Sequence, residues 1–177
     1  ISLKIFSLMP KLQILIFPDP RLRTVAKSVV KFDETLEKLT QDMLEAMYDG
    51  EGIGLAATQV NIHKRIIVID VTDEKSQPIV LINPIKIEAS KQKLSTYAEG
   101  CLSVPGFFEE IERPDFIKIS HLDVKGEKHI LKAEGILAIV IQHEMDHLDG
   151  KVFVDYLSNL KRERIRTKLN KIKKGKR

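Results

Sequence analysis

The sequence predicts an α+β fold in which small antiparallel β-sheets surround a central buried helix, with a further helix at the C-terminus. Three stretches predict helices. At 33–48 and 158–171 apolar residues recur every three or four positions, which is typical of helices with one buried face, and 134–148 is apolar on almost every side, which is typical of a buried helix. Short β-branched runs lie between the first two stretches. Because strands and helices do not alternate, as a βαβ repeat would require, we expect antiparallel sheets.

The length of 177 residues suits one globular domain, and we expect a single domain over 1–177. An N-terminal arm, residues 1–11, is apolar but is interrupted by Lys4 and Pro10 and lacks a signal-peptide cleavage pattern, with Met9 as an alternative start. No apolar run reaches the roughly 18 residues that a membrane span needs. The single cysteine leaves no internal disulfide, and together these features favour a cytoplasmic protein that does not enter the membrane.

The first helix is expected to begin after Asp33, which can cap it, and to end near Tyr48. Its apolar face carries five residues at helical spacing: Phe32, Leu36, Leu39, Met43 and Met47. The glycine-containing segment 52–59, GIGLAATQ, follows and lacks the Lys-Ser/Thr ending of a phosphate loop. Two interpretations of it stay open: a tightly packed loop, or a wall that aims the amide of Gln59 at a site as a hydrogen-bond donor.

Five β-branched runs in the middle of the chain predict short strands separated by turn residues. They are 65–71, 79–82, 85–87, 117–124 and 129–131. The segment 95–114 contains two glycines and two prolines, so we expect it to be irregular. An irregular segment held by a rigid scaffold is a common host for a functional site.

The second helix, about 134–148, begins with apolar residues on almost every side, so we expect it to be central and buried. The third helix, about 158–171, has a narrow apolar stripe formed by Leu160, Ile165, Leu169 and Ile172. The C-terminal helix and tail, 158–177, is basic: residues 161–177 hold ten Lys or Arg and one acid, a net charge of +9. Since the whole chain has a net charge of +4, the other 160 residues carry −5. Such a tail suits either contact with phosphates or a solvated surface.

Residues 143–147, His-Glu-Met-Asp-His, form an HExxH motif on the expected central helix. The i, i+4 spacing puts His143 and His147 on one face, where they can share a metal ion while Glu144 lies beside a bound water. The alternative is a pair of ordinary hydrogen-bonded histidines. Two imidazoles and two acids on a buried helix are costly without a partner, which favours the metal.

A third metal ligand is expected upstream of the motif. Metzincins require a further histidine at the position that Phe153 occupies here, and no histidine follows His147. Cys101 is the best candidate, because a thiolate is a strong ligand for zinc or ferrous iron and the preceding Gly100 allows a close backbone approach. The remaining histidines, His63, His121 and His129, are interpreted as ordinary.

Three segments in this order, GIGLAATQ (52–59), EGCLS (99–103) and QHEMDH (142–147), resemble the three signature motifs of the bacterial peptide deformylases. The resemblance extends to residues 19–23 and 154–157 and covers roughly 12–170. It implies hydrolytic removal of the N-formyl group from the initiator methionine of nascent polypeptides by a metal-bound water. It also implies one divalent metal ion, with Fe²⁺ as the native metal and Zn²⁺, Ni²⁺ or Co²⁺ as substitutes.

Carried over by position, the resemblance gives each motif residue a role. Cys101, His143 and His147 would hold the metal, and Glu144 would be the general acid and base. Gln59 and the backbone N–H of Leu102 would stabilise the oxyanion, a role that fits the second interpretation of segment 52–59.

Two further expectations concern specificity and support of the site. We expect Ile53, Ile139 and Val140 to form an apolar methionine pocket, with Gly54 and Leu102 packed closely enough to exclude larger acyl groups. We also expect an ion pair between Glu99 and Arg113 that orients the cysteine loop. Residues 106–112 are more acidic and aromatic than the resemblance leads us to expect.

Two rival functions compete with this interpretation. A metallopeptidase, the usual owner of HExxH, would cleave internal peptide bonds and take its third ligand downstream. An RNA-binding protein with a structural Cys-His-His metal would use the basic tail, but a structural zinc normally has a fourth protein ligand. The partners expected from the resemblance and from the basic tail are the N-formyl-methionyl nascent peptide and the ribosome. The oligomeric state stays undetermined.

Overall fold

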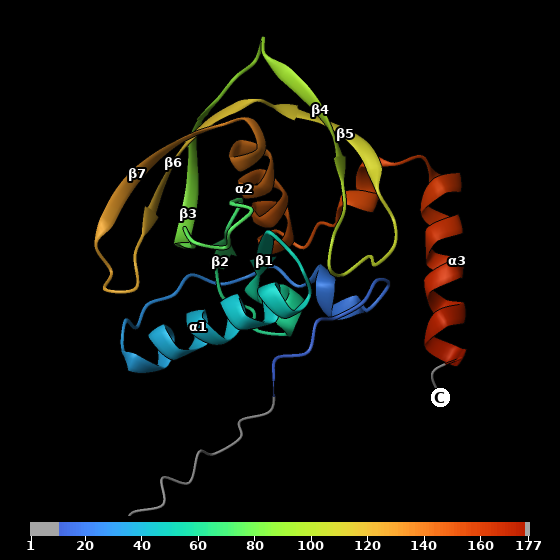
Figure 1. Cartoon of the computed structure of the whole chain (residues 1–177), viewed down its shortest axis with the longest axis horizontal. Helices are drawn as coiled ribbons and strands as arrows, with labels where there is room; N and C mark the ends of the chain where they lie inside the picture. Colours follow the sequence, from blue (N-terminus) through green and yellow to red (C-terminus); the bar gives the residue numbers. More distant parts are fainter. Residues whose placement is uncertain (1–10, 176–177) are drawn as a thin grey trace, which may run out of the picture.

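The computed structural model describes residues 11–175 of the chain, so most of the expected N-terminal arm, including Met9, lies outside the described residues. The helices are α1 (Glu34–Asp49), α2 (Gly135–Leu148) and α3 (Asn159–Gly175), and short 3-10 turns are η1 (Pro20–Arg23), η2 (Ala57–Val60) and η3 (Phe153–Tyr156). The strands are β1 (Gly54–Ala56), β2 (Ile66–Ile69), β3 (Ile79–Ala89), β4 (Leu94–Glu99), β5 (Glu109–Pro114), β6 (Phe116–Leu122) and β7 (Lys128–Glu134). Figure 1 shows their arrangement.

Two antiparallel sheets confirm the predicted α+β class. A five-stranded sheet has the order β1-β2-β3-β6-β7, and a separate two-stranded sheet pairs β4 with β5. All of the strand pairs are antiparallel. In Figure 1, α2 lies at the centre of the molecule, next to the five-stranded sheet, and α3 stands apart at one side.

The sheet has a helix on each face, and β2 shows why. Its four residues are all fully buried. Because alternate side chains of a strand point to opposite faces, full burial requires that both faces of the sheet are covered. Ile67 and Ile69 join the cluster that contains α2, while Ile66 and Val68 join the cluster that contains α1. The resulting order is helix, sheet, helix, with α2 held between the large sheet and the β4–β5 hairpin (Figure 1).

The first two helices begin and end as their sequences predict. A side-chain oxygen of Asp33 accepts a hydrogen bond of 3.1 Å from the Leu36 N–H, which caps α1, and Met43 and Met47 on its apolar face are fully buried. Strand β7 leads directly into α2, whose residues from Ala138 to Glu144 are all buried. The prediction of a central, buried HExxH helix is therefore confirmed.

The prediction that 95–114 is irregular was wrong. Strands β4 and β5 pair over six residues, from Leu94 opposite Pro114 to Glu99 opposite Glu109, and only 100–108 lies outside them. The sequence of β4, LSTYAE, has no alternation of apolar and polar residues, although in the structure one face of the strand is exposed and the other is half-buried or buried. Its strand character comes from pairing with β5, which residue preference does not report.

Two smaller expectations also need correction. The runs 79–82 and 85–87 are parts of one strand, β3, with a register shift between Ile82 and Ile85 at the point where Asn83 has a positive φ of 50°. The apolar stripe of α3 is shorter than expected, since Leu160 and Ile172 are 83% and 53% exposed. Only Ile165 and Leu169 of the stripe are buried, in a cluster with η3.

Within residues 11–175, no helix has the length and apolar character needed to cross a membrane. The prediction of one domain over 1–177 stays a prediction.

Candidate metal centre

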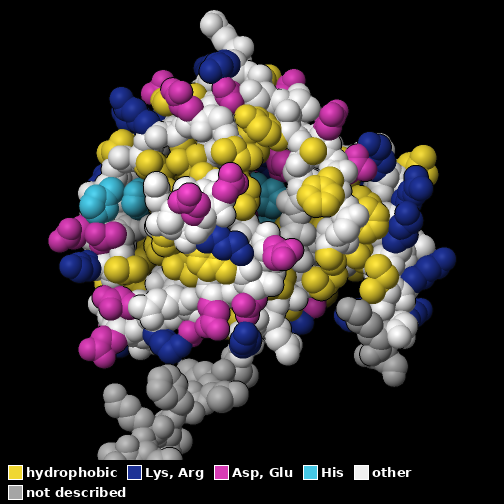
Figure 2. Space-filling view, in the orientation of Figure 1, with side chains coloured by type: hydrophobic (Ala, Val, Ile, Leu, Met, Phe, Trp, Pro, Cys, Tyr) yellow, Lys and Arg dark blue, Asp and Glu magenta, His cyan; other side chains and the backbone are white. Residues whose placement is uncertain are grey.

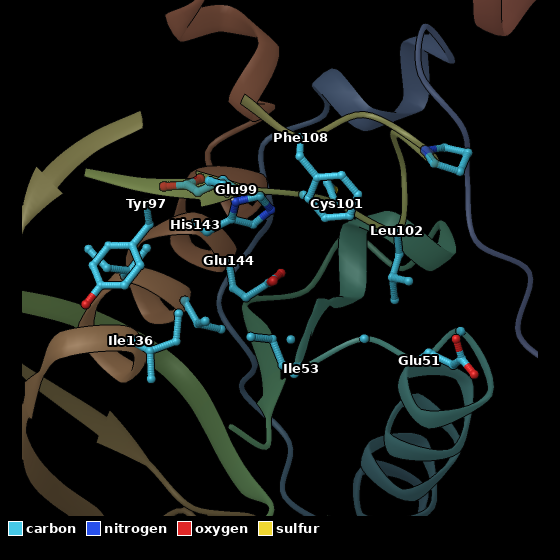
Figure 3. A pocket seen from close by; sticks show the side chains of 18 of the residues that line it. Glu51, Ile53, Tyr97, Glu99, Cys101, Leu102, Phe108, Ile136, His143 and Glu144 are labelled. Atoms are coloured by element: carbon cyan, nitrogen blue, oxygen red, sulfur yellow. Dashed lines mark hydrogen bonds and ion pairs between the residues drawn. The ribbon is translucent and has the colours of Figure 1, made fainter. Parts of the chain in front are cut away.

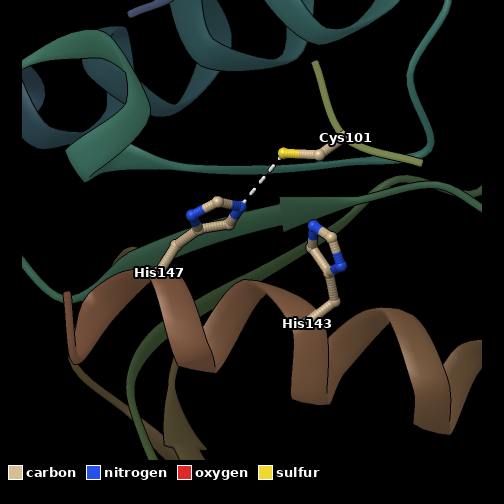
Figure 4. Close-up of side chains that lie close together, drawn as sticks. All are labelled: Cys101, His143 and His147. Carbon is tan, nitrogen blue, oxygen red and sulfur yellow. Dashed lines mark hydrogen bonds between the residues drawn. The ribbon is translucent and has the colours of Figure 1, made fainter. Parts of the chain in front are cut away.

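The structure brings the three expected metal ligands together. One face of α2 presents His143 and His147, and the loop after β4 presents Cys101 (Figure 4). The candidate ligand atoms of the three side chains all lie within 4.8 Å of one another. The Cys101 Sγ and His147 Nε2 atoms are 3.3 Å apart. This geometry follows from the i, i+4 spacing of the motif, since residues four apart stand one above the other on a helix.

Glu99 lies behind one of these ligands. Its Oε2 atom is 2.8 Å from Nδ1 of His143, so a proton on Nδ1 leaves Nε2 as the electron-pair donor toward the centre. Burial opposes ionisation of Glu99, but hydrogen bonds from His143 and Arg113 outweigh it and lower its pKa below the usual value. The carboxylate is therefore charged, which fixes the tautomer and the orientation of the His143 ring.

The expected ion pair between Glu99 and Arg113 is present. The Arg113 Nε and Nη2 atoms lie 2.5 Å and 3.1 Å from the two oxygens of Glu99, and both side chains are buried. The third nitrogen, Nη1, donates to Oδ2 of Asp146 at 2.8 Å. A bidentate contact of this kind holds both groups in one plane, so Arg113 joins strands β4 and β5 to helix α2.

Glu144 is buried beside the histidines and its Oε2 atom has no hydrogen-bond partner among the described residues. Burial raises its pKa to about 7. In Figure 3 its side chain projects into the pocket, between the labelled Ile53 and His143. A buried carboxylate without a partner is costly, and such groups concentrate where a protein handles protons or ligands.

The residues present fit a divalent metal ion. One thiolate and two imidazoles are a donor set that zinc and ferrous iron accept, and the Nδ1 atom of His147 is also buried without a partner in the part of the chain that the structure describes. Burial lowers the pKa of His147 well below its usual value, which keeps that ring neutral, as a metal ligand must be. Over residues 11–175, Cys101 is grouped with no fourth His, Cys, Asp or Glu. This group matches a centre with an open position better than a closed structural one.

A second group of possible ligands lies at the turn between β6 and β7: Asp123, Glu127 and His129. The oxygens of Asp123 are already occupied by backbone N–H groups of the turn and by His129 at 2.9 Å. These three residues therefore stabilise the turn. This agrees with the interpretation of His129 as an ordinary histidine without a role in the site.

The segment 52–59 is strand β1 followed by η2, and its last side chain is aimed at the cysteine loop. Gln59 is buried, and its Oε1 atom accepts a hydrogen bond of 2.9 Å from the Ala56 N–H. Its Nε2 atom lies 3.0 Å from Ser103 Oγ and 3.4 Å from Cys101 Sγ. The sequence left two interpretations of this segment open. The position of the Gln59 amide agrees with the one in which the segment aims this side chain at a site.

Gly54 and Leu102 make the close contacts that their positions in the motifs suggested. A Cβ atom on Gly54 would lie 2.5 Å from Oε1 of Glu144 and 2.8 Å from Cγ1 of Val140. The side chain of Leu102 packs over Gly50 and Gly52. The absence of a side chain at Gly54 is therefore what lets Glu144 occupy its place beside β1.

Cys101, His143 and Glu144 line a pocket of about 540 Å³ (Figure 3). In Figure 2 hydrophobic side chains surround a hollow in which histidine is visible. The three residues expected to form the methionine pocket, Ile53, Ile139 and Val140, all line it, and so does Gly54. Its walls are mainly apolar, with Glu144 and His143 on one side, which suits a small apolar side chain next to a reacting group.

The large apolar or aromatic side chains of three residues that were not anticipated also line the pocket: Tyr97, Phe108 and Ile136. Ile136 could have been found, because it precedes Ile139, Val140 and His143 by three, four and seven positions and so shares their helix face. Tyr97 could have been found only by recognising β4, where it points to the same side as Glu99. Phe108 belongs to the aromatic segment 106–112 and carried no signal for its position.

Together these features define the class of protein: an α+β protein with a candidate metal centre, in which an HExxH helix faces a cysteine loop at an apolar pocket. Known proteins agree. A model of the polypeptide deformylase family matches residues 11–163. A peptide deformylase of Cellvibrio japonicus is 59% identical over 163 residues, which is 92% of this chain and 96% of that protein. The peptide deformylase of Pseudomonas aeruginosa is 57% identical over 160 residues, 90% of this chain and 95% of that one.

Solved structures give the same result. A peptide deformylase from Legionella pneumophila has a TM-score of 0.87 at 43% identity and covers 93% of this chain and 96% of its own. The peptide deformylase from Ehrlichia chaffeensis in complex with actinonin has a TM-score of 0.87 at 44% identity and covers 92% of this chain and 98% of its own. The chain belongs to the polypeptide deformylase family.

Proposed function

We propose that this protein removes the N-formyl group from the initiator methionine of nascent polypeptides, with Glu144 as general acid and base. The observation that carries the proposal is the position of Glu144. It is buried, has an oxygen without a protein partner among the described residues, and lies beside Cys101, His143 and His147 at an apolar pocket. Family membership supports the same reaction.

The three candidate ligands would hold one divalent ion, with Fe²⁺ as the proposed native metal and Zn²⁺, Ni²⁺ or Co²⁺ as substitutes. Such an ion, when bound, supplies Lewis-acid activation of a water molecule and of the formyl carbonyl. The chain's contribution is to fix the ligands. Glu99 orients His143 through Nδ1, and Arg113 holds Glu99.

Glu144 would take a proton from the attacking water and return it to the leaving amine. One carboxylate can serve both steps, because its pKa of about 7 leaves the charged and the neutral form close in free energy at neutral pH. Burial also keeps bulk water from competing for its oxygens.

Gln59 and the backbone N–H of Leu102 would stabilise the negative charge that develops on the formyl oxygen. The amide of Gln59 is held from behind by the Ala56 N–H and is aimed at the cysteine loop, so it needs little reorganisation during the reaction. One preorganised donor of this kind typically contributes about 3 kcal/mol to the stability of the transition state.

Specificity would come from two features of the pocket. Ile53, Ile139 and Val140 offer apolar contacts for a methionine side chain, and Ile136 extends this surface. The close approach of Gly54 and Leu102 leaves little space around the reacting carbon, which favours formyl over acetyl.

The test is release of formate from formyl-Met-Ala, with acetyl-Met-Ala and an unblocked peptide as controls. We expect formate from the formyl peptide and no cleavage of the two controls. Cleavage of internal peptide bonds without release of formate would support the rival metallopeptidase instead.

Replacing Gly54 by alanine is expected to lower kcat for this peptide by about 100-fold, since a shift of a reacting group by about 1 Å has an effect of this size. The added Cβ would overlap Oε1 of Glu144 and Cγ1 of Val140, so the carboxylate must move. Gly175→Ala is the matched control, because a Cβ there meets nothing within 4 Å. Equal kcat values for the two variants, measured at equal metal content, would contradict the proposed position of Glu144.

The basic helix α3 is proposed to contact ribosomal RNA, and a cytoplasmic location goes with this proposal. Its buried residues Ile165 and Leu169 anchor it to η3, so deleting the helix would also disturb the fold. Charge reversal on its exposed side tests the contact without that damage. The residues chosen are Arg164, Lys171 and Lys174, all exposed.

We expect the triple variant with glutamate at these three positions to bind ribosomes more weakly, with a smaller dependence on salt, because each lost phosphate contact removes a released counterion. Its activity on formyl-Met-Ala should be unchanged. Glutamates at the exposed Lys86, Lys91 and Lys128 give the same change of charge elsewhere. If both triple variants bind ribosomes equally well, α3 is only a solvated basic surface.

A further inference from the structure

Asp146 is the one polar residue of the HExxH motif to which the proposed chemistry gives no task. It precedes His147 on α2, and its side chain is only 17% exposed. Its Oδ2 atom accepts two hydrogen bonds, one of 2.8 Å from Nη1 of Arg113 and one of 2.7 Å from the hydroxyl of Tyr156. Both donors come from outside the helix, so Asp146 is held by strand β5 and by η3 at once.

Arg113 lies between two carboxylates. Its Nε and Nη2 atoms contact Glu99, and its Nη1 atom contacts Asp146. Because a guanidinium is planar and rigid, a contact on one edge fixes the direction of the N–H groups on the other edge. The orientation in which Arg113 meets Glu99 therefore depends on Asp146.

Tyr156 completes this arrangement from the surface. Its ring lies 5.0 Å from Cζ of Arg113, and its hydroxyl donates to Asp146. Burial and the contact with Asp146 raise the pKa of Tyr156 to about 12, so the hydroxyl keeps its proton and remains a donor. The residue is half exposed, which means that its hydroxyl can be removed without opening the core.

We propose that Asp146 and Tyr156 are positioning residues for the metal ligand His143, acting through Arg113 and Glu99. Four contacts join η3 to the ligand: Tyr156 to Asp146, Asp146 to Arg113, Arg113 to Glu99, and Glu99 to Nδ1 of His143. The inference rests on the proposed function, because it requires that His143 binds a metal ion.

The expected consequence is a change in metal affinity. A carboxylate on the far nitrogen of a ligand imidazole fixes its tautomer and raises its basicity, and the loss of such outer contacts typically lowers metal affinity about 10-fold to 100-fold. Asp146→Asn keeps the shape but removes the charge that Arg113 contacts, so we expect an affinity about 10-fold lower. Tyr156→Phe keeps the ring over Arg113 and should lower the affinity by a smaller factor.

Arg113 and Glu99 themselves are poor targets for this test. Both are buried, and removing one partner of a buried ion pair leaves an uncompensated charge that destabilises the whole fold. Asp146 and Tyr156 lie at the outer end of the series of contacts and are less buried than Arg113 and Glu99.

The experiment uses Co²⁺ added to the metal-free full chain in the presence of a competing chelator. Binding is followed by the visible absorption of the thiolate-ligated ion. Two matched controls are available. Asp149→Asn breaks another aspartate–arginine contact, 2.9 Å to Arg65, at the residue that follows α2, and Tyr48→Phe breaks another tyrosine–aspartate hydrogen bond, 2.7 Å to Asp70.

We expect weaker Co²⁺ binding and a shifted absorption band in Asp146→Asn and Tyr156→Phe, at melting temperatures equal to those of the two controls. If Asp146→Asn and Tyr156→Phe bind Co²⁺ with the affinity and the spectrum of the unchanged protein, the inference is wrong. The proposed metal site is not affected by that result. If Asp146→Asn does not fold, Tyr156→Phe decides alone. Absence of Co²⁺ binding by the unchanged protein would overturn both the inference and the proposed function.

Discussion

Replacing Glu144 by glutamine is expected to lower kcat/KM for formyl-Met-Ala by about 10²-fold to 10⁴-fold, the range that a positioned general acid and base contributes. At about 1.4 kcal/mol per factor of ten, this is roughly 3–5 kcal/mol of transition-state stabilisation. Glutamine has the size of glutamate but cannot take a proton. Because Glu144 is buried with one oxygen unpartnered among the described residues, the neutral amide should not disturb the fold.

The measurement is the initial rate of formate release at equal metal content. Glu134→Gln is the matched control, because Glu134 precedes the first residue of the same helix and is exposed. The control should retain the full rate. A Glu144→Gln variant within about threefold of the unchanged protein would remove Glu144 from the proposed chemistry, since the smallest effect expected of a general base is about 100-fold.

Removing one of the three candidate ligands is expected to abolish tight metal binding. Cys101→Ala and His147→Ala each leave two ligands in a centre where the Sγ and Nε2 atoms are 3.3 Å apart. The rate should fall by about 10³-fold, because a Lewis acid contributes several kcal/mol to such a reaction. Metal content per chain after dialysis and the rate of formate release are the two readouts.

His121→Ala is the control for these variants. His121 is half-buried in β6, and its Nδ1 atom lies 3.2 Å from the carbonyl oxygen of Leu122, outside the candidate metal centre. It should keep both metal and activity. If Cys101→Ala retained one metal ion per chain, Cys101 would not be a ligand and the centre would have to be sought elsewhere.

Much of the site was predictable because its signals are local. The spacing of His143, Glu144 and His147 fixes their faces on any helix. The residues before them are apolar on almost every side, which predicts that the helix is buried. The position of Cys101 followed from what the motif lacks downstream, where Phe153 stands. The structure agrees in placing Phe153 in the core, with its ring centroid 6.2 Å from that of His143.

The parts that the sequence did not predict depend on contacts between distant segments. The sequence of β4 has no period-two pattern of apolar residues, and its strand character comes from its register with β5. The same hairpin aligns Glu99 and Arg113, which are 14 positions apart, behind His143. Asp146 is visible in the motif, but its contact with Tyr156 requires the turn at η3, which no local pattern indicates.

We propose that one metal ion, held by Cys101, His143 and His147, makes this chain a deformylase. The most direct measurement is the rate of formate release from formyl-Met-Ala as Fe²⁺ or Co²⁺ is added, without oxygen, to metal-free protein. We expect no activity at the start, a linear rise, and a plateau at one equivalent of metal per chain. Full activity of the metal-free protein, or a plateau that Cys101→Ala reaches equally well, would contradict it.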